Sequence, residues 1–133
     1  MTVAYCDTSA LIDVIEGNSF GFEALTKLDA LRQDGAALVS SAVTIVEIGR
    51  YLSRTESSGG QRLQRAQDIT ALLDLIDISN PVVGSAATLP IVHLAALDAI
   101  HVASALLVQA DLVLTRDRQM IRACEELGLT VAS

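Results

Sequence analysis

The sequence predicts an α/β fold in which a mainly parallel central sheet lies between two layers of helices, a three-layer α/β/α arrangement. Two observations support this prediction: short apolar segments alternate with longer amphipathic segments along the chain, and 51% of the 133 residues are hydrophobic. Aromatic residues make up only 3%, so we expect a core of aliphatic side chains. A chain of this length corresponds to one domain, which we expect to span residues 1–133.

The first part of the chain predicts a strand followed by two helices. Residues 3–6 form the strand, and a helix follows over residues 8–15, with Asp13 exposed. Residues 20–34 predict a second helix, because apolar residues recur there at helical spacing. The residues expected on its inward face are Phe22, Leu25, Leu28 and Leu31.

The middle of the chain predicts two strands separated by two helices. Residues 37–40 form the first of these strands, and Ser41 is a suitable N-cap for a helix that reaches Leu52. The core-facing stripe expected for this helix is Ala42, Ile45, Val46, Gly49 and Leu52. A further helix is predicted over residues 61–76, before a short strand over residues 77–79. The inward residues expected for the second helix include Leu63, Ala66, Ile69 and Ile76.

The last part of the chain alternates in the same way. Its predicted elements are a helix from Asn80 to before Pro90, a helix over residues 96–109, a strand over 112–115, a helix over 118–127 and a final strand over 129–131. The helix over residues 96–109 is apolar or small on nearly every side, which is typical of a helix packed from several directions. Asp98, near its start, is costly unless a helix N-terminus, an arginine or a metal ion compensates its charge.

Four acidic residues are expected to meet at one edge of the sheet. Asp7 and Asp117 each follow an apolar strand, and the ends of parallel strands lie at the same edge. Glu47 and Asp98 lie in the first turn or two of helices, and a helix that follows a strand begins at this same edge. Thr8 and Thr115 bring hydroxyl groups to the edge as well.

Clustered carboxylates without a metal would repel one another and raise each other's pKa values. Oxygen ligands of this kind suit Mg²⁺ or Mn²⁺, and no cluster of Cys and His residues indicates zinc or copper. Such an ion could polarise a phosphodiester, lower the pKa of an attacking water and stabilise the leaving oxygen. Local interpretations of single residues stay open: Asp7 could cap the following helix, and Glu47 could form a surface pair with Arg50.

The overall composition limits the classes of function. A formal net charge of −7 argues against a protein that coats nucleic acids, but it is compatible with an acidic site that binds cations. No apolar run is long enough to span a membrane, and the first residues lack the pattern of a signal peptide. We therefore expect a cytoplasmic protein with no membrane partner. Cys6 and Cys124 show no metal-binding spacing and are expected to be buried thiols.

Four segments together carry a resemblance to a known family. They are Asp7-Thr-Ser-Ala-Leu, Thr-Ile-Val-Glu47-Ile, Leu-Asp98-Ala-Ile-His-Val-Ala-Ser-Ala and Leu-Thr115-Arg-Asp117. In this order and spacing, which cover essentially the whole chain, they resemble a PIN domain, and more narrowly the VapC-type toxin of a type II toxin–antitoxin pair. The resemblance implies a compact PIN-like α/β/α domain that acts as a Mg²⁺- or Mn²⁺-dependent endoribonuclease.

The resemblance also implies site residues and partners. By position, Asp7, Glu47, Asp98 and Asp117 match the acidic residues that hold the metal, and Thr115 matches the hydroxyl that accompanies them. The implied partners are an RNA substrate, a cognate VapB-type antitoxin and a second copy of the chain in a homodimer. The competing interpretation is a catalytically inactive PIN-like scaffold that only binds RNA or protein. Loss of one of the acids would favour the scaffold, and none is lost here.

Several arginines near the acids are candidates for contact with RNA. Arg116 and Arg118 could bind RNA phosphates, pair with Glu125 or Glu126, or lie in solvent. The other candidates are Arg50 and Arg54, beside Glu47.

One histidine, His101, lies one turn after Asp98 in the apolar helix. It could serve as a general base, since its ordinary pKa lies near neutrality. A histidine packed in the core is the favoured interpretation, because a metal-bound water needs no histidine to activate it.

Overall fold

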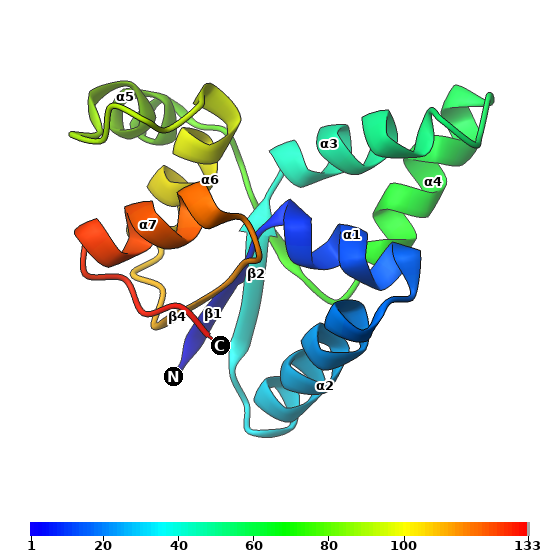
Figure 1. Ribbon diagram of the computed structural model, residues 1–133, viewed down its shortest axis with the longest axis horizontal. Coiled ribbons are helices and arrows are strands. Elements are labelled where there is room, and N and C mark those ends of the chain that lie inside the picture. The colour runs from blue at the N-terminus through cyan, green and yellow to red at the C-terminus, as the bar shows by residue number, and fades with distance from the viewer. Residues whose placement is uncertain (133) are drawn as a thin grey trace.

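A four-stranded parallel sheet with the strand order β3-β2-β1-β4 forms the centre of the computed structural model, which describes residues 1–132 (Figure 1). The strands are β1 (Val3–Cys6), β2 (Ala37–Ser41), β3 (Asp74–Ile76) and β4 (Leu112–Leu114). The helices are α1 (Thr8–Glu16), α2 (Ser19–Gln33), α3 (Val43–Leu52), α4 (Gly59–Ile69), α5 (Asn80–Thr88), α6 (Ala96–Leu107) and α7 (Arg118–Glu126). All neighbouring strands are parallel, which confirms the predicted α/β class. The last residue of the predicted domain, residue 133, lies outside the described residues.

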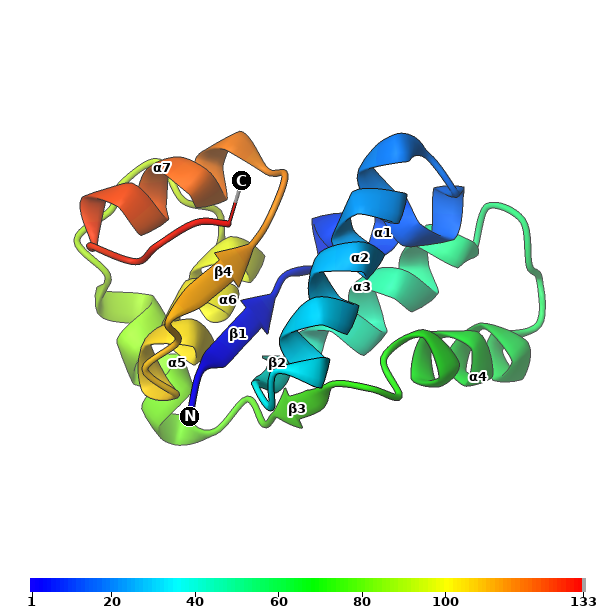
Figure 2. The same ribbon diagram turned by 90° about the horizontal axis from the view of Figure 1, so that it is seen from below.

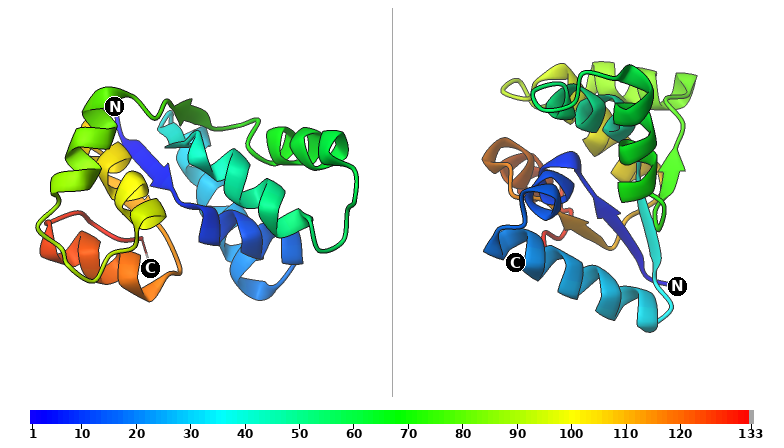
Figure 3. Two further views of the ribbon diagram at one scale, coloured as in Figure 1. Left: turned by 90° about the horizontal axis from the view of Figure 1, so that it is seen from above. Right: turned by 90° about the vertical axis from the view of Figure 1, so that its right-hand side faces the viewer.

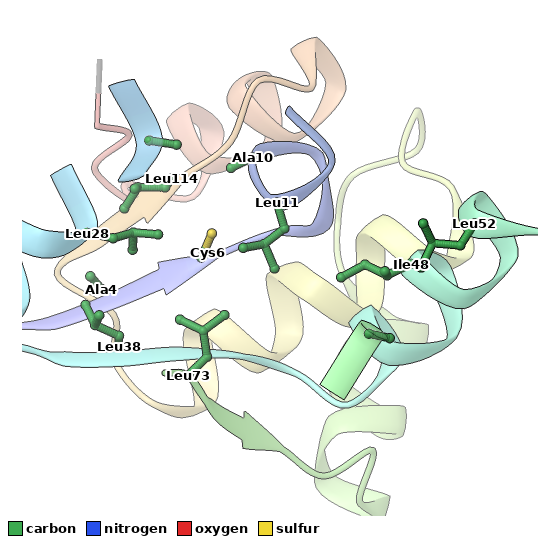
Figure 4. Packing of buried hydrophobic residues seen from close by; sticks show 12 residues of the cluster. Ala4, Cys6, Ala10, Leu11, Leu28, Leu38, Ile48, Leu52, Leu73 and Leu114 are labelled. Atoms are coloured by element: carbon green, nitrogen blue, oxygen red, sulfur yellow. The ribbon is translucent and has the colours of Figure 1, made fainter. Parts of the chain in front are cut away.

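Successive side chains of β1 point to opposite faces of the sheet, as strand geometry requires. Ala4 and Cys6 pack in one cluster with Leu11 of α1 and Leu28 of α2 (Figure 4). Tyr5, between them, belongs to a second cluster that includes residues of α6 and α7. Figure 2 and the left view of Figure 3 show α5, α6 and α7 grouped on the opposite side of the sheet from α1 and α2. Helices therefore cover both faces, and the predicted three-layer arrangement is confirmed.

The close contact between α1 and α2 depends on Gly21. A Cβ atom at this position would lie 2.1 Å from the backbone oxygen of Asp13, a separation that no side chain tolerates. α2 therefore turns its small residues Gly21 and Ala24 toward α1 and buries them. Phe22 and Leu25 are exposed, so the prediction that they face the core is wrong.

The boundary between α4 and β3 also differs from the prediction. α4 ends at Ile69, and the third strand is Asp74–Ile76 instead of residues 77–79. At the end of the helix the hydroxyl of Thr70 donates to the carbonyl oxygen of Ala66 at 2.9 Å, and a turn leads into β3. The apolar residues of this stretch fit the spacing of a helix and that of a short buried strand, which explains the error.

Two further predictions fail toward the edges of the fold. The predicted strand over residues 129–131 is reduced to a single parallel bridge between Val131 and Val113. In α4, all of which is described, Ala66 is the one buried residue, and Leu63 is 48% exposed. The reason is that α4 packs against α3 and extends away from the sheet (Figure 1).

α3 turns a different face to the core from the predicted stripe. Its buried residues are Val43, Thr44, Ile48 and Leu52. Val46, which the predicted stripe placed inward, is 59% exposed. Glu47 follows Val43 and Thr44 by one turn, so the observed orientation of α3 places Glu47 on the side of the helix that faces the protein.

The parallel sheet brings the carboxyl ends of all four strands to one edge, where α1, α3 and α7 begin. α7 buries Met120 and Cys124, and Cys6 and Cys124 are both buried free thiols, as predicted. Within residues 1–132, no helix combines the length and the apolar character needed to cross a membrane.

Candidate active site

Asp7 and Asp117 lie at the carboxyl edge of the sheet, as predicted, and each is the N-cap of a helix. Asp7 caps α1 and Asp117 caps α7. In Asp7, Oδ1 accepts hydrogen bonds from the backbone N–H groups of Ser9 at 3.0 Å and Ala10 at 3.4 Å. The interpretation of Asp7 as a cap is therefore confirmed, and it leaves the second carboxylate oxygen for other contacts.

The Asp7 carboxylate is held by hydroxyl groups in a buried environment. Asp7 is only 3% exposed. Oδ2 accepts a hydrogen bond from Thr115 at 2.5 Å, and Oδ1 accepts one from the hydroxyl of Ser9 at 2.6 Å. Burial raises the pKa of Asp7 above its usual value, and the hydrogen bonds from Ser9 and Thr115 offset only part of this effect. A cation beside Asp7 would therefore relieve an unfavourable buried charge.

Thr115 connects the two strand-end acids. Its Oγ1 donates to Asp7 and accepts a hydrogen bond from the backbone N–H of Asp117 at 3.1 Å. Oδ1 of Asp117 accepts hydrogen bonds from two backbone N–H groups in the first turn of α7, at 2.8 and 3.1 Å. The predicted position of the Thr115 hydroxyl at the sheet edge is confirmed, whereas its contacts with both acids and the contribution of Ser9 were not predicted.

Glu47 is anchored by residues from α1 and α6. Its Oε1 accepts a hydrogen bond from the hydroxyl of Thr8 at 2.8 Å and lies 2.6 Å from Nε2 of His101. Partial burial by itself raises the pKa of Glu47, but the hydrogen bonds from His101 and Thr8 hold the pKa below its usual value. The interpretation of Glu47 as a surface pair with Arg50 is wrong, because the Glu47 carboxylate contacts His101 instead.

His101 is 2% exposed, as expected for a packed histidine, but both of its ring nitrogens have polar partners. Nδ1 lies 2.6 Å from the hydroxyl oxygen of Tyr5. Burial raises the pKa of Tyr5 far above its usual value, so this hydroxyl stays protonated and can donate to Nδ1. Nε2 then carries the ring proton and donates it to Glu47. The Tyr5–His101 pair thereby fixes the orientation of the Glu47 carboxylate.

A row of buried hydroxyl groups continues from Glu47 into the sheet. Oγ1 of Thr8 lies 3.2 Å from Oγ1 of Thr44, which lies 2.9 Å from Oγ of Ser40. Ser40 in turn donates to the backbone oxygen of Cys6 at 2.6 Å. The sequence placed the Thr8 hydroxyl at this edge, whereas the contributions of Thr44 and Ser40 were not predicted. Thr8 carried a usable signal, because it directly follows an acid at a strand end.

Asp98 interacts with the other three acids through their charges. It lies in the first turn of α6, partly exposed, and partial burial raises its pKa to about 6. Neighbouring carboxylates act in the same direction, and they belong to Asp117, Asp7 and Glu47. The charges of the other three acids thus act on Asp98. Within the described residues, Asp98 has no side-chain hydrogen bond.

The donor set fits a hard divalent cation, because it consists of carboxylates and a hydroxyl group. A positive ion would also relieve the raised pKa values of Asp7 and Asp98. Across residues 1–132, no three His, Cys, Asp or Glu side chains are already arranged as a metal site. Mg²⁺ is commonly held by one or two carboxylates while it keeps several waters, so it does not require a preformed cage.

Arg116 pairs with a partner that was not predicted. Its Nε donates to Oδ2 of Asp13 at 2.8 Å, and its guanidinium carbon lies 3.3 Å from the ring centroid of Phe20. The suggested pairing of Arg116 with Glu125 or Glu126 is therefore wrong. The prediction that Asp13 is exposed is wrong as well, because Asp13 is buried at this ion pair.

The other candidate arginines, Arg50, Arg54 and Arg118, are exposed. The guanidinium of Arg54 lies 5.6 Å from the ring centroid of Tyr51. In the part of the chain that the structure describes, no ion pair joins these arginines to the four acids. Their contact with RNA stays a prediction.

Comparison with known proteins agrees with this arrangement of acids. A family model described as the PIN domain matches residues 4–126. The chain belongs to the PIN-domain family. It is 32% identical over 131 residues to Ribonuclease VapC47 of Mycobacterium tuberculosis (strain CDC 1551 / Oshkosh), an alignment that covers 97% of this chain and 95% of the relative. The predicted resemblance to PIN domains of the VapC type is thus confirmed, and nucleases of this type depend on a metal ion.

Solved structures show that the fold of this PIN domain recurs at low sequence identity. A toxin–antitoxin complex from Klebsiella pneumoniae contains a chain with a TM-score of 0.72 and 23% identity, covering 98% of this chain and 96% of that one. VapBC2 from Rickettsia felis, bound to a DNA fragment from its promoter, gives a TM-score of 0.74 at 15% identity and covers 98% of both chains. At these identities the likeness establishes the fold.

Proposed function

We propose that this PIN domain is a Mg²⁺-dependent endoribonuclease and the toxin component of a VapBC-type toxin–antitoxin pair. The observation that carries the proposal is that Thr115 joins Asp7 and Asp117 at the carboxyl edge of the sheet. Glu47 is held at the same edge by the hydroxyl of Thr8, the residue that follows Asp7. The identity of 32% with Ribonuclease VapC47 supports the same activity. Mn²⁺ is an alternative ion, because it accepts the same oxygen ligands. We further propose that residues 1–133 form one domain that works in the cytoplasm.

Asp7, Glu47, Asp98 and Asp117 are the residues that would hold the ion. Bound there, the ion would supply Lewis-acid activation of the phosphodiester and of the attacking water. Asp7 and Asp117 offer carboxylates that their helix caps already hold in place. Asp98 has no competing side-chain hydrogen bond among the described residues, so its carboxylate is free to turn toward a cation.

The neighbours of these acids have positioning roles in this proposal. Thr115 holds Oδ2 of Asp7, and His101 holds Oε1 of Glu47 with support from Tyr5. His101 is a positioning residue and not a general base, because both of its nitrogens are engaged in a buried environment. Loss of such a supporting group commonly lowers metal affinity or activity by about 10- to 100-fold.

The proposed partners are a VapB-type antitoxin and a second copy of the chain. The antitoxin is supported by the relatives named above, two of which were solved in complexes described as toxin–antitoxin or VapBC. A homodimer is supported by large apolar side chains that are exposed on and around α5 and α6. They are Val83, Val92, Leu97 and Leu107.

Cleavage of RNA by the purified protein tests the proposed function. We expect cellular RNA to be cut when Mg²⁺ is present and to stay intact with EDTA. The Asp98→Asn variant should lose more than the roughly 100-fold that removal of a supporting group costs. Asp68→Asn, an exposed substitution on α4, is the matched control and should cut at the wild-type rate. Sequencing the ends of the products would identify the RNA that is cut.

Two results would contradict the proposed function. Cutting that persists in EDTA, or an Asp98→Asn variant as fast as the wild type, would exclude this site as the source of activity. The inactive scaffold would instead bind RNA without cutting it, and calorimetry would then detect no specific binding of Mn²⁺ to the wild-type protein.

A further inference from the structure

A cavity of about 550 Å³ opens beside the candidate active site. Its walls come from α1 and α2 on one side and from α7 and the C-terminal segment on the other, elements whose placement Figure 2 shows. Thr115 lines this cavity and also donates to Asp7, so the cavity lies beside the sheet edge that carries Asp7. Its volume lies in the range of roughly 300–1,000 Å³ found for small-ligand pockets, and it can accept a nucleoside.

The guanidinium of Arg116 forms a fixed flat surface in this cavity. The ring of Phe20 supports it at 3.3 Å, and Asp13 holds its Nε at 2.8 Å. The backbone N–H of Arg116 donates to Oγ of Ser9 at 2.9 Å, and Ser9 in turn donates to Asp7. The Arg116 side chain is still 45% exposed, so it remains accessible to a ligand. A side chain that is already held loses little conformational entropy on binding.

The cavity has a different charge balance from the chain as a whole. Its ionisable lining residues are Lys27, Arg116, Arg118, Asp13, Glu23 and Glu125, so their formal charges cancel, in a chain with a net charge of −7. Lys27 is the only lysine of the sequence. The four acids repel an RNA strand until a metal ion binds them. The cavity surface has no net charge and offers three positively charged side chains to the RNA.

We propose that this cavity binds an unpaired nucleobase of the RNA next to the phosphodiester that is cut. The base stacks on the exposed face of the Arg116 guanidinium, and Lys27 and Arg118 bind the adjoining phosphates. Unstacked RNA bases are commonly recognised by stacking on aromatic rings or on arginine planes, and apolar lining residues such as Ile121 and Leu114 suit a flat base. This inference rests on the proposed ribonuclease function and assigns a substrate-binding role to a cavity outside the acid cluster.

Binding of a short fluorescein-labelled oligoadenylate, followed by fluorescence anisotropy in EDTA, tests this inference. We expect Arg116→Lys to weaken binding by about tenfold, because lysine keeps the charge but loses the stacking plane. Phe20→Leu should weaken binding less, since it leaves the guanidinium in place without its aromatic support. Arg122→Lys is the matched control: Arg122 lies on α7, outside the lining of the cavity, and its substitution should change nothing.

A second RNA strand of the same length that lacks its bases separates stacking from phosphate binding. All variants should bind this abasic strand equally weakly. The inference is overturned if Arg116→Lys binds oligoadenylate as tightly as the wild type, or if it loses the same factor toward the abasic strand. It is also overturned if both variants keep their affinity for RNA but lose affinity for the antitoxin, because the cavity would then be a protein-binding site.

Thermal unfolding of each variant checks that a loss of binding is not a loss of fold. Phe20 is 45% exposed, so Phe20→Leu keeps the test usable even if Arg116→Lys disturbs the ion pair with Asp13. The assay in EDTA needs no cleavage. A wild-type protein that binds the bases as described but never cuts RNA would contradict the proposed function alone. If the wild type cuts RNA and Arg116→Lys binds the bases as tightly as the wild type, only this inference is contradicted.

Discussion

The two halves of the candidate active site are built in different ways. One half, Asp7, Thr115 and Asp117, lies at the ends of strands β1 and β4, and both of its acids cap the helix that follows. The other half, Glu47 and Asp98, lies on helices α3 and α6. We call them the strand half and the helix half. Backbone N–H groups of adjacent residues cap both acids of the strand half, and Thr115 joins the two acids. In the helix half, only contacts with distant residues hold Glu47.

The two halves differ in how firmly their carboxylates are held before a cation binds. In the strand half, Asp7 accepts hydrogen bonds on both carboxylate oxygens. In the helix half, Glu47 depends on the buried histidine, and Asp98 has no side-chain hydrogen bond within the described residues. We infer that the strand half supplies a rigid anchor for the ion, and that the helix half supplies the part of the site that adjusts to it.

The largest effect is expected from removing the charge of the rigid anchor. Asp7→Asn should lower the cleavage rate by more than about 100-fold, because a metal ligand is lost and not merely a supporting group. The folded state should be as stable as the wild type or more stable, since Asn is a good N-cap and the uncompensated buried charge disappears. Initial cleavage rates and urea unfolding of the same preparation measure the two effects.

A clear loss of stability in Asp7→Asn would contradict the role of the strand half as an anchor for the ion. It would mean that the ionised carboxylate itself is needed for the fold, so that the strand half would be a structural feature first. Thr115→Asn is not a suitable substitute test, because it would alter the contacts of Asp7 and Asp117 at once.

An intermediate effect is expected from the support of the helix half. His101→Leu leaves Oε1 of Glu47 with the hydroxyl of Thr8 as its remaining partner. We expect about a 10- to 100-fold loss of Mn²⁺ affinity, measured by calorimetry, and a similar loss of cleavage rate. His101→Gln keeps a donor for Glu47 and should recover part of both. Equal Mn²⁺ affinity in His101→Leu and the wild type would show that the histidine only fills the core.

The strand half could be predicted from the sequence because its signals are local. An acid directly after an apolar strand, followed by an amphipathic segment, predicts both the sheet edge and the helix cap. Asp7 and Asp117 therefore lie where expected, and Thr115 lies between them. The same reasoning predicted the parallel sheet, since strands alternate with helices along the chain.

The helix half could be predicted only in outline because its contacts join distant residues. Two apolar stripes compete on α3, and the stripe that contains Val46 is the one that faces solvent. The support of Glu47 by His101 spans 54 residues, and that of His101 by Tyr5 spans 96. The pairing of Arg116 with Asp13 spans 103 residues. No local pattern encodes these contacts, which arise when the layers of the fold pack together.

The smallest effect is expected at Asp98, which has no side-chain hydrogen bond among residues 1–132. Its pKa is raised from 3.8 to about 6, by partial burial first and then by the other acids. Because the pKa of Asp98 is higher in the folded state, its protonated form stabilises the fold below about pH 4. This stabilisation is lost as the pH rises through about 6. In EDTA, Asp98→Asn should therefore match the wild type near pH 4 and be more stable above pH 6. We expect a difference of about 1 kcal/mol, after allowing for solvent screening at a partly exposed carboxylate.

Urea unfolding at several pH values, with and without Mg²⁺, measures this difference. Saturating Mg²⁺ should reverse its sign at neutral pH, because the ion stabilises the wild type through a carboxylate that the variant lacks. An Asp98→Asn variant that is less stable than the wild type at neutral pH in EDTA would show that Asp98 already has a stabilising partner. The helix half would then be as rigid as the strand half before any cation binds, and the division of the site into an anchor and an adjustable part would fail.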